Sequence, residues 1–268
     1  MPYFENLGAR LYYEESGPDG RPLVFLHGFA LDGRQWTRQV ERFSSQYRVI
    51  TLDARGHGKS SLPAGKVDNG LYWRDVVALL DHLDIGRATL CGNSMGGHVA
   101  LQVAINAGER VEGLILIGAI CTNRFNRYER WGVPVNRFCC RLMPISWLAW
   151  SISVGMGNYN HAERPYIKEA VKCVGYGGFN RSWKAVTTME SRPGLPQVSC
   201  PTLLLIGADD TMTGRQQPYM QEQITGSQLV TIPRSHHATN LDNPEQVEQE
   251  IERFLQGLEE AAHPPRCC

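Results

Sequence analysis

The chain has 268 residues, and its 27 basic and 27 acidic side chains give a formal net charge of zero at neutral pH. This length suits one large domain with room for an insertion. The balanced charge provides no overall field for nucleic acid or an anionic membrane, and no apolar stretch approaches the ~20 residues of a membrane span. The N-terminal segment lacks the apolar core of a signal peptide. We therefore expect a cytoplasmic protein with no nucleic-acid or membrane partner.

Eight cysteines are present, and none forms a C-x-x-C pair or a cluster with histidine at zinc-binding spacing. We expect reduced thiols and no metal site. The terminal pair Cys267-Cys268 lacks the C-a-a-X form of a prenylation signal, so we interpret it as part of a disordered tail.

Short apolar runs alternate with longer amphipathic segments, which is typical of a mostly parallel sheet covered by helices on both faces. Runs such as LVFLHG and LLLIG are continuously apolar, which favours strands that are buried on both sides. The predicted strands are 10–15, 23–27, 47–53, 88–92, 113–118, 202–207 and 228–232. The predicted helices are 35–45, 71–83, 95–107, 216–224 and 244–256.

The alternation stops between residues 122 and 198, a stretch far longer than a crossover between parallel strands needs. We predict a helical cap there, inserted into a core domain formed by residues 1–121 and 199–268. An arginine-rich opening at 123–128 is a candidate hinge. The cap holds four of the six tryptophans, which either line a substrate pocket or pack the cap onto the core: Trp131, Trp147, Trp150 and Trp183.

The run RATLCGNSMGG places a G-x-S-x-G pentapeptide where a buried strand should turn sharply into a helix. A nucleophile at the tip of so tight a turn has strained backbone angles. Gly92 and Gly96 remove side chains that would collide, so Ser94 can stand clear of the sheet. The helix that follows directs its N-terminal amides toward the place where an oxyanion would form.

A serine nucleophile needs a base, and the base needs an acid that orients it. The pair His236-His237 follows the last predicted strand, and Asp209-Asp210 follow the strand before it. Loops after parallel strands gather at the carboxyl edge of the sheet, so both pairs are expected near Ser94. Residue type alone leaves either member of each pair open.

Together these motifs resemble the α/β-hydrolase family over essentially the whole chain, in the family order Ser, Asp, His. The resemblance extends to HGF at 27–29, DARGHGKS at 53–60 and GADD at 207–210. It implies an α/β-hydrolase fold with a helical cap, and it selects Asp210 and His237 within the two pairs. It also implies an oxyanion hole formed by the backbone N–H groups of Phe29 and Met95, with His27 bracing the loop and no cofactor.

The reaction implied by the resemblance is hydrolysis of a carboxylic ester or lactone, because the layout is most similar to 3-oxoadipate enol-lactonase-like and small carboxylesterase members. Ser94 argues against haloalkane dehalogenases. The elbow GNSMGGH resembles that of C–C bond hydrolases, and HGFALDGRQW resembles the loop of cofactor-free haloperoxidases and perhydrolases, so both chemistries stay open. Acyl transfer and a non-enzymatic signalling or receptor role are further alternatives. The natural substrate, beyond a small ester or lactone, and the oligomeric state are not determined.

Overall fold

The computed structural model describes residues 2–157 and 159–262, so the terminal Cys267-Cys268 lies outside the described residues. Within these ranges an eight-stranded sheet runs in the order β1-β2-β4-β3-β5-β6-β7-β8. The β1–β2 and β2–β4 pairs are antiparallel and all other pairs are parallel. The strands are β1 (Tyr3–Asn6), β2 (Ala9–Ser16), β3 (Pro22–Leu26), β4 (Arg48–Leu52), β5 (Ala88–Asn93), β6 (Val111–Ile117), β7 (Thr202–Gly207) and β8 (Gln228–Ile232).

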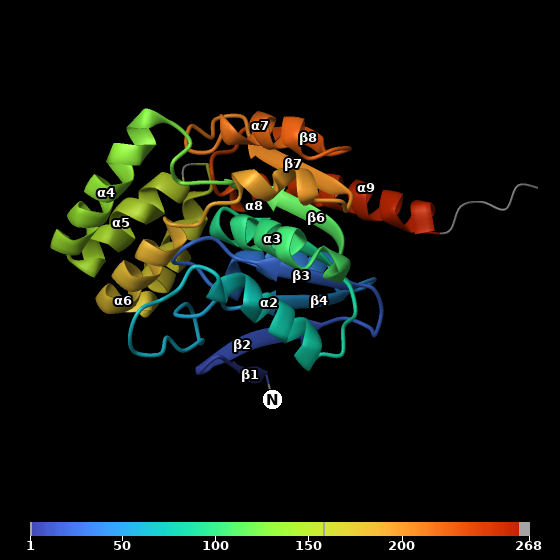
Figure 1. Ribbon diagram of the computed structural model, residues 1–268, viewed down its shortest axis with the longest axis horizontal. Coiled ribbons are helices and arrows are strands. Elements are labelled where there is room, and N and C mark those ends of the chain that lie inside the picture. The colour runs from blue at the N-terminus through green and yellow to red at the C-terminus, as the bar shows by residue number, and fades with distance from the viewer. Residues whose placement is uncertain (1, 158, 263–268) are drawn as a thin grey trace, which may run out of the picture.

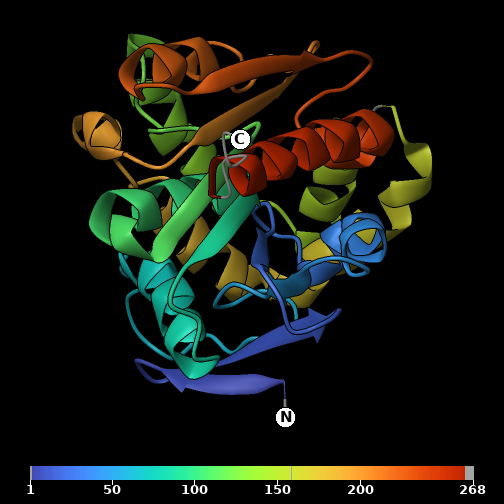
Figure 2. The ribbon, with the colours of Figure 1, turned by 90° about the vertical axis from the view of Figure 1, so that its right-hand side faces the viewer.

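Helices cover both faces of the sheet (Figure 2). Apolar side chains from α2, α3 and α7 pack against one face, and those from α1 and α9 pack against the other. The stripe Val247, Ile251 and Leu255 of α9 is buried, as its spacing of four residues predicts. These helices are α1 (Thr37–Phe43), α2 (Leu71–His82), α3 (Met95–Asn106), α7 (Gln216–Gln223), the short α8 (Thr239–Asp242) and α9 (Pro244–Ala262).

The strand order reverses next to β3, which lies between β4 and β5. The chain first moves from β3 to β4 on one side and then returns to β5 on the other. The connections that leave the carboxyl ends of β3 and β5 therefore diverge and leave a crevice between them, which is where ligands bind in open α/β sheets. Phe29 follows β3 and Ser94 follows β5, so the topology places both residues at this crevice.

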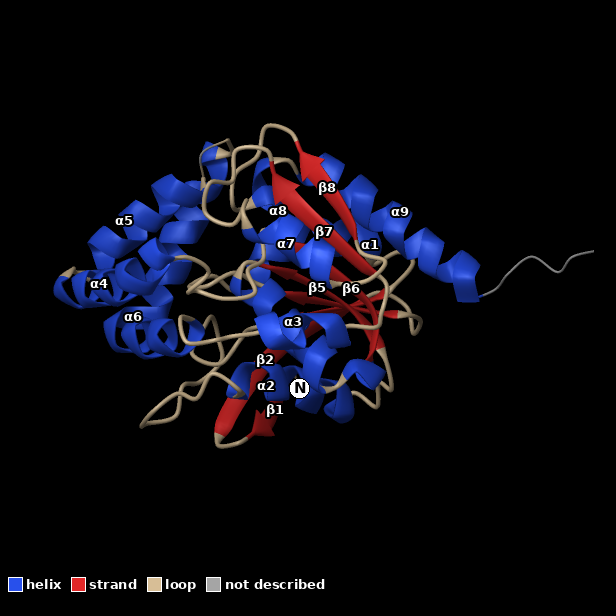
Figure 3. Cartoon of the chain, turned by 45° about the horizontal axis from the view of Figure 1, so that its top comes forward, coloured by secondary structure: helices blue, strands red, loops and turns tan. Residues whose placement is uncertain are grey.

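Three further helices form a layer beyond the carboxyl ends of the strands (Figures 1 and 3). They are α4 (Arg127–Leu142), α5 (Ile145–Met156) and α6 (Arg164–Val186). They share a buried apolar cluster with Ala30, Leu31 and Leu241 of the core loops, so the layer is attached directly above the crevice. The α/β-hydrolase arrangement expected from the sequence is thus confirmed. The exact boundaries of a separate cap domain stay a prediction.

Two details of the sheet and its helices differ from the sequence expectation. The edge strand β1 was not expected, because its four residues are too few to show a strand pattern; it forms through a tight turn in which Leu7 and Gly8 have positive φ angles of 45° and 77°. The predicted helix 35–45 is divided into a 3₁₀ turn, Gly33–Trp36, and α1. Asp32 caps this 3₁₀ turn by accepting a hydrogen bond from the N–H of Arg34.

The turn between β5 and α3 depends on close backbone contacts at two glycines. A Cβ atom at Gly92 would lie 2.3 Å from the backbone carbon of Gly96, and one at Gly96 would lie 2.0 Å from the carbonyl oxygen of Leu26. Real Cβ atoms do not approach backbone this closely. Only glycine therefore allows α3 to begin directly against β3 and β5.

We expect Gly96→Ala to destabilise the fold by about 3 kcal/mol or more, because the new methyl group must displace the backbone of β3. Urea unfolding would measure the loss. Gly132→Ala is a matched control in α4, since nothing lies within 4 Å of its Cβ position and alanine favours helix. Equal stability of the two variants would contradict this account of the turn.

Candidate active site

Ser94 occupies the tip of the β5–α3 turn with strained backbone angles, φ 52° and ψ −111°. Its N–H donates a hydrogen bond to the carbonyl of Ile117 at 2.9 Å, which ties the turn to the neighbouring strand β6. Its Oγ lies 2.8 Å from Nε2 of His237. The strained turn therefore holds the hydroxyl out of the sheet and within hydrogen-bond distance of an imidazole.

His237 and Asp210 come from the loops after β8 and β7. Nδ1 of His237 lies 3.1 Å from Oδ2 of Asp210, and the aspartate side chain is buried. Asp210 Oδ1 also accepts hydrogen bonds from the N–H groups of Met212 and Thr213. Burial alone would raise the pKa of Asp210, but the hydrogen bonds from His237 and Thr213 outweigh it and lower the pKa to about 2. Asp210 is therefore a carboxylate at neutral pH and favours a proton on the facing nitrogen of His237.

The neighbouring members of the two pairs lie elsewhere. Asp209 is exposed and accepts a hydrogen bond from the hydroxyl of Tyr159 at 2.6 Å. The ring of His236 packs beside the same tyrosine, with ring centroids 5.5 Å apart. Of the four candidates, the structure brings Asp210 and His237 to Ser94. Their catalytic roles stay a prediction.

The two expected oxyanion donors flank Ser94. Met95 is the first residue of α3, where a backbone N–H has no partner within the helix. Phe29 lies in the turn after β3, and it borders the same cavities as Ser94. The adjacent Ala30 has a positive φ of 62°. This geometry is compatible with two amides directed at one oxyanion, and that role stays a prediction.

A buried amide, Gln35, holds the loop of Phe29 in place. Its Oε1 accepts a hydrogen bond from the N–H of Gly28 at 2.8 Å, and its Nε2 donates to Oδ1 of Asn93 at 2.9 Å and of Asn240 at 3.0 Å. Asn93 in turn donates to the carbonyl of His237 at 3.1 Å. The three side chains are at most 1% exposed. One network therefore joins the segments that carry Phe29, Ser94 and His237, and no pattern in the sequence predicts it.

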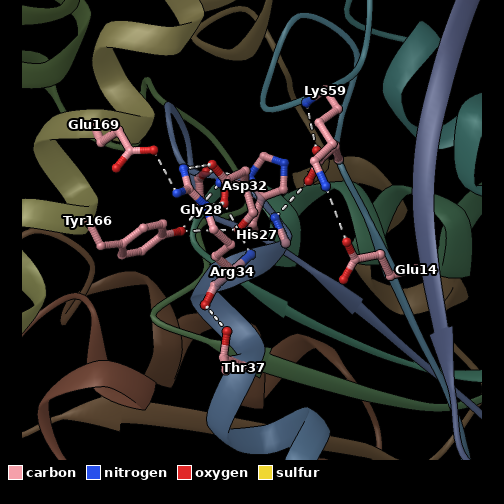
Figure 4. Close-up of polar contacts among 11 residues, drawn as sticks. Glu14, His27, Gly28, Asp32, Arg34, Thr37, Lys59, Tyr166 and Glu169 are labelled. Carbon is pink, nitrogen blue, oxygen red and sulfur yellow. Dashed lines mark hydrogen bonds and ion pairs between the residues drawn. The ribbon is translucent and has the colours of Figure 1, made fainter.

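On its outer side the same loop contacts α6 of the cap layer (Figure 4). The hydroxyl of Tyr166 donates a hydrogen bond to the carbonyl of Asp32 at 3.2 Å. Arg34 bridges the side chain of Asp32 at 2.8 Å and that of Glu169 at 2.8 Å. The Arg34–Glu169 pair is exposed and adds little stability, whereas the Tyr166 contact is partly buried. The loop is thus fixed from both the core and the cap.

Two other histidines near the site, His27 and His98, form hydrogen bonds with groups of the surrounding fold. His27 accepts a hydrogen bond from the N–H of Ala54 at 3.0 Å, in keeping with the bracing role expected for it. His98, one turn after Ser94 on α3, is fully buried, and burial lowers its pKa to about 4. Its Nε2 lies 2.9 Å from the hydroxyl of Ser191. Among the described residues, no group of three or more His, Cys, Asp or Glu side chains is arranged to hold a metal ion.

Two cavities open on Ser94 and His237. The larger, of about 430 Å³, lies beneath the cap helices and has a predominantly apolar lining that includes Cys140, Met143 and Leu148. The smaller, of about 300 Å³, extends along α3 and has more polar walls, including Thr122, Asn123 and Glu129. No lysine or arginine lines either cavity among residues 2–157 and 159–262. The site therefore offers no fixed positive charge to an anionic substrate.

The four cap tryptophans fall into two groups. Trp147 lines the larger cavity, and Trp183 lines both. Trp131 and Trp150 are 79% and 53% exposed, and neither borders either of these two cavities. Trp147 and Trp150 are three residues apart on α5 and are therefore neighbours on the helix surface, with ring centroids 6.2 Å apart. Of this pair, Trp147 reaches the larger cavity. Only Trp147 and Trp183 have positions that suit a substrate-binding role.

Comparison with known proteins agrees with this geometry. Residues 23–250 match the alpha/beta hydrolase family, and the chain belongs to that family. It is 30% identical to 3-oxoadipate enol-lactonase 2 of Acinetobacter baylyi over 91% of this chain and 92% of the relative. It is 29% identical to a putative non-heme chloroperoxidase of Synechocystis, over 92% and 95% of the two chains.

Among solved structures, a thermophilic esterase from Thermogutta terrifontis is similar, with a TM-score of 0.85 and 28% identity over 96% of this chain and 97% of the other. These similarities support hydrolytic activity in this chain. They do not decide the substrate, because proteins named for different reactions share the fold.

We expect Asp210→Asn to lower kcat on the order of 10³-fold or more, because the amide no longer orients and stabilises His237 as a carboxylate does. Asp209→Asn is the matched control and should change kcat little, since Asp209 binds Tyr159 instead. Steady-state hydrolysis of an aryl ester would measure both variants. A larger loss in the control would show that the assignment within this pair is reversed.

We expect Gln35→Leu to lower both stability and kcat, because it leaves the buried N–H of Gly28 and the oxygens of Asn93 and Asn240 without a partner. Each unsatisfied buried group costs about 1–3 kcal/mol. Gln221→Leu, at an exposed position of α7, serves as the control. Urea unfolding together with kcat and KM would test this, and an unaltered kcat would show that the network does not position the site.

Proposed function

We propose that the protein hydrolyses a carboxylic ester or lactone through an acyl-enzyme on Ser94. The observation that carries the proposal is the continuous hydrogen-bonded arrangement of Ser94 Oγ, the His237 imidazole and the Asp210 carboxylate, with separations of 2.8 Å and 3.1 Å. The lowered pKa of Asp210 supports it, because an ionised aspartate stabilises the imidazolium that forms during the reaction.

In the proposed mechanism, His237 removes the proton from Ser94 as Oγ attacks the substrate carbonyl. The N–H groups of Phe29 and Met95 stabilise the negative oxygen of the tetrahedral intermediate. His237 then protonates the departing alkoxide, and the acyl group remains on Ser94. A water molecule, activated by the same imidazole, attacks the acyl-enzyme and releases the acid.

The cavities favour a neutral substrate with a sizeable apolar part. A free carboxylate placed in either cavity would lose its hydration without gaining a lysine or arginine partner, which is strongly unfavourable. The apolar walls of the larger cavity, by contrast, stabilise hydrocarbon at about 25 cal/mol per Å² of contact. We therefore propose an uncharged ester or lactone whose apolar portion occupies the larger cavity.

A fluorophosphonate probe tests the nucleophile directly. We expect stoichiometric covalent labelling of Ser94 in the native protein and none in Ser94→Ala, which should also lose esterase activity by a factor on the order of 10⁴ or more. A well-folded native protein that neither reacts with the probe nor hydrolyses any member of an ester and lactone panel would refute the proposal. That outcome would favour a binding or signalling role.

The preference for a neutral substrate predicts a large effect of substrate charge. Between two aryl esters of equal length, the one with a terminal methyl group should have a kcat/KM at least about 100-fold higher than the one with a terminal carboxylate. Comparable values for the two esters would show that the acyl chain does not enter these cavities.

The position of Trp147 in the larger cavity predicts a chain-length effect. We expect Trp147→Ala to lower kcat/KM for a hexanoyl or octanoyl ester about tenfold more than for the acetyl ester, because only the longer chain loses contact with the indole. Trp131→Ala, outside the cavity, is the control and should leave the profile unchanged. Equal losses for all chain lengths in Trp147→Ala would instead indicate a purely structural role.

A further inference from the structure

The outer face of α4 exposes a continuous apolar stripe. At 3.6 residues per turn, alternate spacings of three and four keep its five members within an arc of roughly 80°. Their side chains are 60–86% exposed. The members are Tyr128, Trp131, Val135, Phe138 and Leu142. Only Cys140 of this helix is buried, so the stripe faces away from the rest of the cap.

Five arginines accompany the stripe, and the only acidic residue between 124 and 142 is Glu129. Its carboxylate accepts hydrogen bonds from the N–H of Phe125 and the side chain of Asn126, so it caps the helix and neutralises no arginine. Among the described residues, none of the five arginines forms an ion pair. They are Arg124, Arg127, Arg130, Arg137 and Arg141.

Four of these arginines lie on α4 itself, on the flank between the stripe and the packed side of the helix. Burial, together with the nearby charges of Arg141 and Arg124, lowers the pKa of Arg137. The cluster thus contains unpaired positive charge beside exposed apolar surface, although the whole chain is neutral. Aromatic and leucine side chains beside a row of arginines are the composition of a helix that lies in a membrane interface.

We propose that α4 docks the protein on an anionic lipid surface, with the stripe inserted at the level of the headgroups and the arginines bound to lipid phosphates. Charge complementarity favours this partner over a second copy of the chain, because the α4 face of a second copy would present the same arginines and no free carboxylate to pair with them. In Figures 1 and 3, α4 lies on the side of the cap layer that is remote from the sheet, so no described helix or strand obstructs the approach. Among the described residues, no helix could span a membrane, so the contact is peripheral.

Docking by α4 also brings the larger cavity to the lipid. Asn136, Cys139 and Cys140, on other faces of the same helix, line that cavity. Trp147 lines it as well and is 47% exposed. An apolar ester dissolved in the lipid would therefore meet the cavity without crossing bulk water. The docking proposal does not depend on the chemistry of Ser94, since binding needs only the outer face of α4.

Vesicle sedimentation tests the proposal with the full chain. We expect the native protein and Ser94→Ala to bind vesicles of phosphatidylcholine mixed with phosphatidylglycerol, and to bind pure phosphatidylcholine at least tenfold more weakly. The double change Arg127→Gln/Arg130→Gln should weaken binding about fivefold per arginine. Trp131→Ser/Phe138→Ser should reduce it by at least tenfold, and added salt should weaken native binding.

Matched controls separate docking from general charge and hydrophobicity. Arg10→Gln/Arg74→Gln removes two exposed arginines elsewhere, and Leu7→Ser removes an exposed apolar side chain in the β1–β2 turn, so both should bind as the native protein does. All α4 variants should keep native activity on a water-soluble acetyl ester, which shows that they are folded. The proposal is overturned if the native protein ignores anionic vesicles, or if the controls lose binding as the α4 variants do. A further outcome would also overturn it: the native protein does not bind lipid, and sedimentation velocity shows a dimer that Trp131→Ser/Phe138→Ser converts to a monomer. The stripe would then be a protein interface.

Discussion

The buried amide of Gln35 is the interaction on which the geometry of the site depends. It satisfies hydrogen-bonding groups from three segments that are far apart in the sequence: Gly28 after β3, Asn93 at the end of β5 and Asn240 in α8. Because all of these groups are removed from water, no solvent molecule can replace a lost partner at low cost. The network therefore favours a single relative arrangement of the loops that carry Phe29, Ser94 and His237. Catalytic geometry of this kind requires that precision, since small displacements are costly.

The β5–α3 turn supplies the second constraint, and it operates through sterics. Ser94 has a positive φ, which is unfavourable for a side chain of its type, and the hydrogen bond to Ile117 together with the packing at Gly96 keeps it there. The strain is tolerated because β5 is buried along its whole length and cannot shift. The site thus combines a turn that cannot relax with a polar network that cannot exchange with water. Both belong to the core, which leaves the cap helices free to differ in their surfaces.

Sequence reasoning identified the parts of the fold that local chemistry determines. The buried parallel strands have continuous apolar runs, and the elbow has a glycine pattern that only a tight turn explains, so both were predicted with nearly correct bounds. The hydrogen-bond partners of Gln35 were not, because they lie up to 205 positions away and glutamine is common on surfaces. The direction of each cap tryptophan was also inaccessible, because a long insertion does not reveal which face of its helices meets the core. The family pattern selected Asp210 over Asp209. In the structure Asp210 lies beside His237 and Asp209 lies beside Tyr159, and the catalytic role of Asp210 stays a prediction.

The cap shows why the net charge of a whole chain does not predict whether one of its surfaces attracts an anionic partner. Equal numbers of acidic and basic residues suggested no attraction to an anionic membrane, yet electrostatic attraction at a surface acts over about a Debye length and depends on the local cluster. On α4 the acidic side chain is engaged in capping the helix, while the arginines remain unpaired beside exposed aromatic rings. An uncharged apolar substrate would itself concentrate in lipid. A cavity that no described lysine or arginine lines and a helix rich in arginine are therefore consistent with each other. The positive charge of the α4 arginines lies outside the cavity, where it would attract the anionic lipid surface. The walls of the larger cavity are mainly apolar, so they would bind an apolar substrate that is dissolved in that lipid.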